Sequence, residues 1–64
     1  MKDIFIKVTT RNEDIPVYIN IRNIVDIYFF DGSTAIQTVR GTYTVKETQE
    51  EVIQIINKEQ QRWL

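Results

Sequence analysis

Residues 40–56, RGTYTVKETQEEVIQII, change their hydrophobic period in the middle. In the first half, Tyr43 and Val45 alternate with polar residues, which is typical of a half-buried strand. From Val52 onward, the apolar residues recur at the spacing of an amphipathic helix. This switch predicts that a β-region ends here and that a single helix follows it.

The residues between the two halves carry the signals of a helix start. Thr48 is followed three residues later by Glu51, which is the spacing of a capping box. Glu50 and Glu51 in the first turn and Arg62 near the end would complement the helix dipole. We therefore expect a helix over about residues 49–62, and we interpret the junction as an architectural feature rather than a catalytic one.

The chain before this junction alternates apolar and polar residues in several short runs. Asp31-Gly32 is the clearest hairpin signal, because both residue types tolerate the positive φ angles of a tight turn. The sequence predicts one α+β domain over residues 1–64, a small antiparallel β-meander of roughly four to five strands followed by one C-terminal α-helix. The expected strands cover about residues 3–10, 17–21, 24–30, 34–39 and 42–46.

The run IVDIYFF, residues 24–30, is apolar on both faces. Strict alternation divides its side chains into two sets, Val25, Ile27 and Phe29 on one face against Ile24, Asp26, Tyr28 and Phe30 on the other. A strand with two apolar faces is either buried on both sides or contacts a partner on one of them. We interpret Tyr28 and Phe30 as candidate interface residues.

The apolar arc of the expected helix is wide. Val52, Ile56 and Trp63 fall within a narrow arc, and Ile53 and Ile55 widen it to roughly half the circumference. A helix that lies on one sheet needs less apolar surface than this. The excess predicts contact with a second surface, for which Ile55 and Trp63 are the candidate residues.

Composition narrows the possible functions. A core within 64 residues rarely supplies more than roughly 3–5 kcal/mol, and small domains usually add disulfides, a metal or a partner subunit. The chain has no cysteine and no histidine, which removes disulfides, the commonest general base and the commonest zinc ligand. Self-association remains, so we expect a homo-oligomer, a dimer or higher.

No motif in the chain predicts catalysis. Ser33 lies in a glycine turn without a histidine to activate it, so it is interpreted as a turn residue. The paired carboxylates Glu13-Asp14 and Glu50-Glu51 fit a polar turn and a helix start better than an acid–base or metal site. We expect no enzyme, no catalytic residue, no metal, no cofactor and no small-molecule substrate.

Nucleic-acid binding is the alternative from another class of function. It would need exposed aromatic residues among basic ones, and the residues available for this are Tyr18, Tyr28, Phe30, Tyr43, Arg22 and Arg40. The net charge of -1 supplies no electrostatic attraction for a phosphate backbone. Aromatic residues on strands more often pack across strands or at a dimer seam, so nucleic acid is the less favoured partner.

The hydrophobic runs are too short for a membrane-spanning segment. The N-terminal MKDIFIKV is also too short, and broken by Lys7, to serve as a signal peptide. We expect a cytoplasmic protein that is not inserted in a membrane.

One spacing joins Asn20, Ile24 and Ile27, and a second runs from Gly41 through Tyr43 and Val45 into the capping box. Together these spacings resemble the short flagellar proteins of the FlbD/SwrD type. The resemblance covers most of residues 4–58 and includes an opening IKVT at 6–9, although RNED at 11–14 replaces that family's Asn-Gly turn. It implies a flagellum-related role. The residues that carry it are Asn20, Ile24, Ile27, Thr34, Gly41, Tyr43, Val45, Lys46, Glu47, Thr48, Glu50, Glu51, Val52, Ile53 and Ile56.

Residues 19–56 also resemble the opening half of the LytTR DNA-binding domain. Both have an Ile-x-x-Ile-Tyr run, here at 24–28, and a Gly-x-Tyr-x-Val run, here at 41–45. An uncharacterised phage or mobile-element protein would fit the same pattern. We expect a non-enzymatic protein-interaction module that self-associates, with a DNA-binding or transcription-regulatory accessory protein as the alternative.

Overall fold

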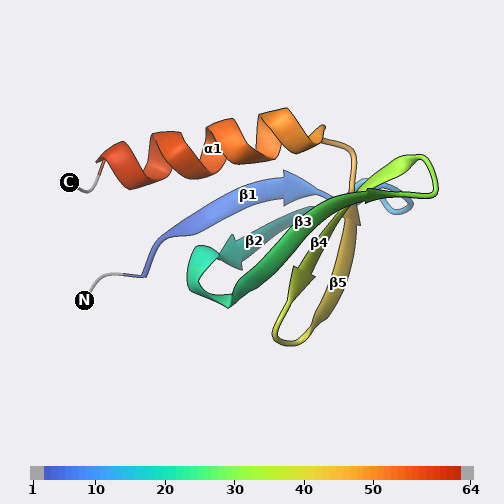
Figure 1. Ribbon diagram of the computed structural model, residues 1–64, viewed down its shortest axis with the longest axis horizontal. Helices are drawn as coiled ribbons and strands as arrows, with labels where there is room; N and C mark the ends of the chain where they lie inside the picture. The colour runs from blue at the N-terminus through green and yellow to red at the C-terminus, as the bar shows by residue number, and fades with distance from the viewer. Residues whose placement is uncertain (1–2, 63–64) are drawn as a thin grey trace.

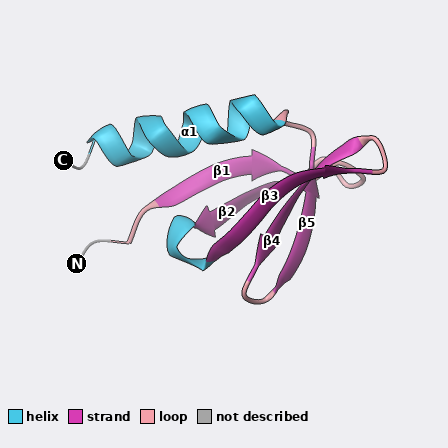
Figure 2. Cartoon of the chain, viewed as in Figure 1, coloured by secondary structure: helices cyan, strands magenta, loops and turns pink. Residues whose placement is uncertain are grey.

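The computed structural model describes residues 3–62, which form five strands, a short 3-10 helix and one α-helix (Figure 1). The strands make up the body of the molecule, and the α-helix lies along one side of it (Figure 2). The predicted α+β class, with antiparallel strands before a C-terminal helix, is confirmed. The elements are β1 (Phe5–Thr9), β2 (Pro16–Asn20), η1 (Ile21–Asn23), β3 (Ile24–Phe30), β4 (Ser33–Thr38), β5 (Gly41–Val45) and α1 (Gln49–Arg62).

The strands form two antiparallel sheets. β1 pairs with β2, and β4 lies between β3 and β5. The sheets meet at one corner, where Thr10 bridges Val45 and the N–H of Lys46 donates to the carbonyl of Thr9 at 2.9 Å. From this corner the strands diverge, and the β4–β5 hairpin extends away from β1 and β2 (Figure 1).

The hydrophobic core lies between the two sheets and α1. The helix runs along β1 and also contacts β3. Burial of each core side chain contributes on the order of 1.5–3 kcal/mol, so these residues hold the two sheets and the helix together. The buried members are Ile6 and Val8 from β1, Ile19 from β2, Ile36 from β4, Val45 from β5 and Val52 from α1.

The predicted capping box is confirmed at the start of α1. The N–H of Glu51 donates to Oγ1 of Thr48 at 3.0 Å, and the N–H of Thr48 donates to Oε1 of Glu51 at 2.8 Å. These two bonds satisfy backbone groups that have no partner inside the helix. Glu47 accepts a bond from the N–H of Thr9 at 3.0 Å, so the helix start is also tied to β1.

The Asp31-Gly32 turn joins β3 to β4. Both residues have positive φ angles, 52° and 78°, which identifies the two-residue type I′ turn that suits a right-twisted hairpin. Phe30 and Ser33 are the paired residues on either side of it. The register of the hairpin follows from this turn.

A β-bulge near the start of β3 corrects one prediction from the sequence. Strict alternation placed Ile24 on the face opposite Ile27, but the register shifts between Ile24 and Asp26, and both isoleucines pack against the core. A bulge inserts one extra residue and reverses the alternation that precedes it. The outer face of β3 therefore consists of Asp26, Tyr28 and Phe30, without Ile24.

Candidate functional site

The second half of β3 presents three consecutive aromatic residues to solvent. The exposed fractions are 36% for Tyr28, 63% for Phe29 and 69% for Phe30. Tyr28 and Phe30 project from the outer face of the sheet, because they pair with Ala35 and Ser33 while the neighbouring pair Ile27–Ile36 faces the core. We call these three aromatic residues and their backbone the β3 edge.

β3 is also an edge strand of its sheet in the described part of the chain. Among residues 3–62, it pairs with β4 and with no other strand. A free edge leaves backbone N–H and C=O groups available to another chain, and proteins commonly protect such an edge with Lys, Pro or a covering segment. The β3 edge contains no Lys and no Pro, and its side chains are aromatic. It has the properties of a pairing surface.

The type I′ turn determines which backbone groups of β3 point outward. In a two-residue hairpin, the residues next to the turn exchange two hydrogen bonds, so Phe30 bonds Ser33. Hydrogen-bonded and non-hydrogen-bonded pairs alternate along the ladder, so Tyr28 also bonds β4. Ile27 and Phe29 therefore direct their N–H and C=O groups to the free edge.

The structure separates the residues that the sequence suggested for an interface. Tyr28 and Phe30 lie together on the outer face of β3. Ile55 lies on α1, is half-buried and packs against the core, so it is on the other side of the sheet. Trp63 lies outside the described residues. Among the residues widening the helical arc, Ile53 is the one that is exposed, at 45%.

Phe29 is the residue of the β3 edge that sequence reasoning missed. Alternation assigned it to the face of Ile27, which is the core face, yet its side chain is mostly exposed. Phe29 lies next to the β3–β4 turn and pairs with Thr34, at the end of the sheet where the hairpin extends beyond the helix (Figure 1). No local signal in the sequence indicates that the core ends before this position.

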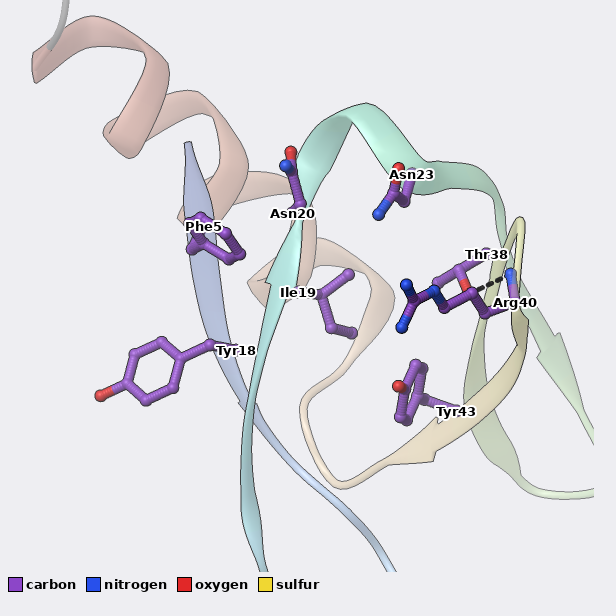
Figure 3. A pocket seen from close by; sticks show the side chains of 8 residues that line it. All are labelled: Phe5, Tyr18, Ile19, Asn20, Asn23, Thr38, Arg40 and Tyr43. Carbon is purple, nitrogen blue, oxygen red and sulfur yellow. Dashed lines mark hydrogen bonds between the residues drawn. The ribbon is translucent and has the colours of Figure 1, made fainter. Parts of the chain in front are cut away.

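A second feature is a cleft of about 290 Å³ between β2 and the β4–β5 hairpin. Ile19 points into it from β2, and Arg40 and Tyr43 point into it from the hairpin, whereas the ring of Tyr18 points away (Figure 3). Asn23 closes one end of the space, and the Arg40 N–H donates to Oγ1 of Thr38 at 3.2 Å. The cleft combines the cation of Arg40 and the amide of Asn23 with the aromatic ring of Tyr43.

Three of the polar side chains considered for catalysis or metal binding, Ser33, Asp14 and Glu51, have partners within the fold. Nη1 of Arg11 donates to Oγ of Ser33 at 2.6 Å and to the carbonyl of Gly32 at 2.9 Å. Asp14 forms an ion pair with Nζ of Lys46 at 2.6 Å, and Glu51 belongs to the capping box. Within residues 3–62, no three acidic side chains come together as a metal site.

Comparisons with known proteins add no relative. No protein-family model matches the sequence, no curated protein matches it, and no solved structure matches the fold. In the part of the chain that the structure describes, no helix is long and apolar enough to cross a bilayer. The β3 edge and the cleft are the two features of the described residues that bear on function.

Proposed function

We propose that this protein is a non-enzymatic interaction module that self-associates through the β3 edge. One observation supports this most directly: Phe29 and Phe30 are each more than three-fifths exposed, beside outward-pointing backbone groups, on a strand that within residues 3–62 pairs with β4 alone. Exposed apolar surface of this kind is characteristic of protein–protein contacts. The domain is also small enough for an added subunit to increase its stability appreciably.

A binding role is favoured over catalysis because the polar groups contribute to the fold. Ser33 receives a hydrogen bond from Arg11, and Thr48 and Glu51 satisfy each other at the start of α1. A nucleophile needs a base within hydrogen-bond reach, and the neighbour of Ser33 is a guanidinium, which cannot act as one.

Sedimentation velocity over a concentration series tests the proposed self-association. We expect the weight-average sedimentation coefficient to rise from the monomer value through the micromolar range. Phe30→Ser should move this transition to higher concentration, whereas Lys58→Ser, on the exposed surface of α1, should leave it in place. A monomer at every concentration, with a cooperative thermal melt, would refute the proposal.

The cleft gives specific support to nucleic-acid binding as a second candidate. Arg40 and Tyr43 line the same cleft, which combines a cation with an aromatic face as in sites that bind single-stranded nucleic acid. Fluorescence anisotropy with labelled single-stranded and duplex oligonucleotides at low salt tests it. Binding that weakens with salt and is lost in Arg40→Gln would favour this candidate, and no binding at low salt would exclude it.

The cellular context remains a proposal that the sequence resemblance alone supports. A flagellum-related role in the cytoplasm follows from the resemblance to FlbD/SwrD-type proteins, and no comparison supports or contradicts it. The genomic neighbourhood tests it directly. Neighbouring flagellar stator genes would favour this context, whereas phage genes or a sensor–regulator pair would favour one of the alternatives.

A further inference from the structure

We propose that two copies of this chain pair through antiparallel β3 strands, with a twofold axis at Tyr28. This arrangement rests on the proposed self-association and specifies its geometry. The two three-stranded sheets would join into one continuous sheet with the order β5-β4-β3-β3-β4-β5. A symmetric pair of this kind closes on itself and buries both β3 edges at once.

The backbone determines the register of this pairing. The outward groups of β3 are those of Ile27 and Phe29, because Tyr28 and Phe30 bond β4. With the axis at Tyr28, Ile27 of one copy lies opposite Phe29 of the second copy, and the same holds in reverse. Each of these two pairs exchanges two bonds, so all the outward donors and acceptors of both residues are used.

The neighbouring registers use fewer of these groups. With the axis at Ile27, Phe29 would face Val25, which lies at the bulge. With the axis at Phe29, Ile27 would face Asp31, which lies in the turn and has a positive φ angle. Registers that differ by one residue, with the axis between two residues, would place core-facing side chains against outer-face ones. The axis at Tyr28 is therefore favoured.

The side chains suit the same register. On the outer face, the two Tyr28 side chains lie directly opposite each other, and Phe30 lies opposite Asp26 of the second copy, so the two Asp26 carboxylates do not face each other. On the core face, Ile27 covers Phe29 of the second copy. This contact would cover part of the Phe29 ring, which is 63% exposed in the single chain.

The expected affinity is modest. A fully buried aromatic side chain buries about 150–250 Å², so the three partly exposed rings of the β3 edge add on the order of 300 Å² per copy. A standard stable interface buries about 800 Å² per partner. The pairing should therefore be reversible and depend on protein concentration.

Cysteine cross-linking tests the register directly, because the chain has no cysteine of its own. At the twofold axis, the two Tyr28 positions form a non-hydrogen-bonded pair with Cα atoms about 4.5 Å apart. This separation lies within the range of about 4.4–6.8 Å that a disulfide spans. Tyr28→Cys should therefore form a covalent dimer rapidly under mild oxidation, at protein concentrations where the unmodified chain associates.

Two further cysteine variants provide the matched control. Phe30→Cys alone should not cross-link, because two Phe30 positions would lie about four residues apart along the paired strands, roughly 13 Å. A mixture of Phe30→Cys and Asp26→Cys should cross-link as a heterodimer, because these positions lie opposite each other in the proposed register. If Tyr28→Cys does not fold, as judged by the loss of a cooperative thermal melt, the mixture of Phe30→Cys and Asp26→Cys still tests the register.

The outcomes separate the register from the proposed self-association. Two outcomes would overturn the register but retain self-association. In both, the protein sediments as a dimer, and either Phe30→Cys alone cross-links rapidly or the mixture gives no heterodimer. A monomer at all concentrations would overturn both. Cross-linking of Tyr28→Cys and of the mixture, with none for Phe30→Cys alone, is the result expected.

Discussion

Two of the edge strands within residues 3–62, β2 and β3, differ in how they expose their backbones. At the two ends of the β1–β2 hairpin, the N–H of Thr10 donates to the carbonyl of Ile15 and the N–H of Ile21 donates to the carbonyl of Ile4. These bonds show which β2 residues direct their backbone groups to β1 and which direct them outward. Pro16 falls in an outward-pointing position, where it supplies no N–H donor. On β3, the outward positions are Ile27 and Phe29, and both keep their donors.

This difference shows how one small fold can protect one edge and leave another available. Proline on an edge strand, with its missing donor toward solvent, is a common protection against unwanted pairing. β2 also has five residues against seven in β3, which limits the length of any ladder it could form. If the protein pairs through a strand, the structure favours β3.

The largest expected effect is on the free energy of unfolding, when a residue of the core between the two sheets is truncated. Ile36 is fully buried and pairs with Ile27 of β3. Ile36→Ala should lower the free energy of unfolding by about 2–5 kcal/mol, because it removes buried methyl groups and leaves a cavity. Urea denaturation measures the change, with Ile53→Ala on the exposed side of α1 as the matched control.

A domain of this size has little stability to lose. If the single core supplies roughly 3–5 kcal/mol, Ile36→Ala should lose most of the stability of the protein, whereas Ile53→Ala should change it by less than about 0.5 kcal/mol. Equal effects of the two substitutions would show that the helix face around Ile53 is buried in the associated protein.

The next effect separates the backbone of β3 from its side chains. Phe29→Pro removes an outward donor while leaving the β4 ladder intact, so the thermal melt should remain cooperative. Self-association should weaken by at least about tenfold, which is about 1.4 kcal/mol. Sedimentation velocity measures the shift.

Two substitutions control for the loss of the aromatic ring and for the assigned direction of the backbone. Phe29→Ala keeps the donor and should weaken association less than Phe29→Pro does. Tyr28→Pro removes a donor that bonds β4, so it should disrupt the monomer itself. A stable Tyr28→Pro monomer together with an unfolded Phe29→Pro would show that the assignment is reversed. The backbone N–H of Phe29 would then bond β4, and that of Tyr28 would point to the free edge.

The sequence carries the local part of this fold. Thr48 and Glu51 predict the start of α1 because a capping box depends on residues three positions apart. Asp31-Gly32 predicts the β3–β4 turn in the same local way, because the turn requires positive φ angles at two adjacent residues and both residue types tolerate them. Such signals are readable without knowledge of the tertiary structure.

The features that define the candidate site depend on long-range packing. The bulge between Ile24 and Asp26 brings both Ile24 and Ile27 onto the core, and the exposure of Phe29 depends on where the core ends. The hydrogen bond from Arg11 to Ser33 joins residues far apart in the chain and has no local signature. Tyr28 and Phe30 could be suggested as interface residues, but their position on a free edge needed the topology.

A smaller effect is expected where the turns of the two hairpins meet. Nη1 of Arg11, in the β1–β2 turn, donates to Gly32 and Ser33 in the β3–β4 hairpin. Arg11→Ala should lower the free energy of unfolding by about 1 kcal/mol, the usual net contribution of such bonds. Urea denaturation again measures it, and Arg11→Lys, which keeps the charge without the planar guanidinium, should recover part of the loss. No change in Arg11→Ala would show that the two hairpins are held by the core alone.

The smallest effect is expected at the protected edge. Pro16→Val restores an outward donor on β2 and gives the unfolded chain more conformational freedom, which should lower stability by about 0.5 kcal/mol. Self-association should stay within about twofold of the unmodified protein, because β2 remains short and the proposed pairing uses β3. Sedimentation velocity on Pro16→Val, alone and combined with Phe29→Pro, measures this. If the double variant regained the association that Phe29→Pro lost, Pro16 would be the element that decides which edge of this fold pairs.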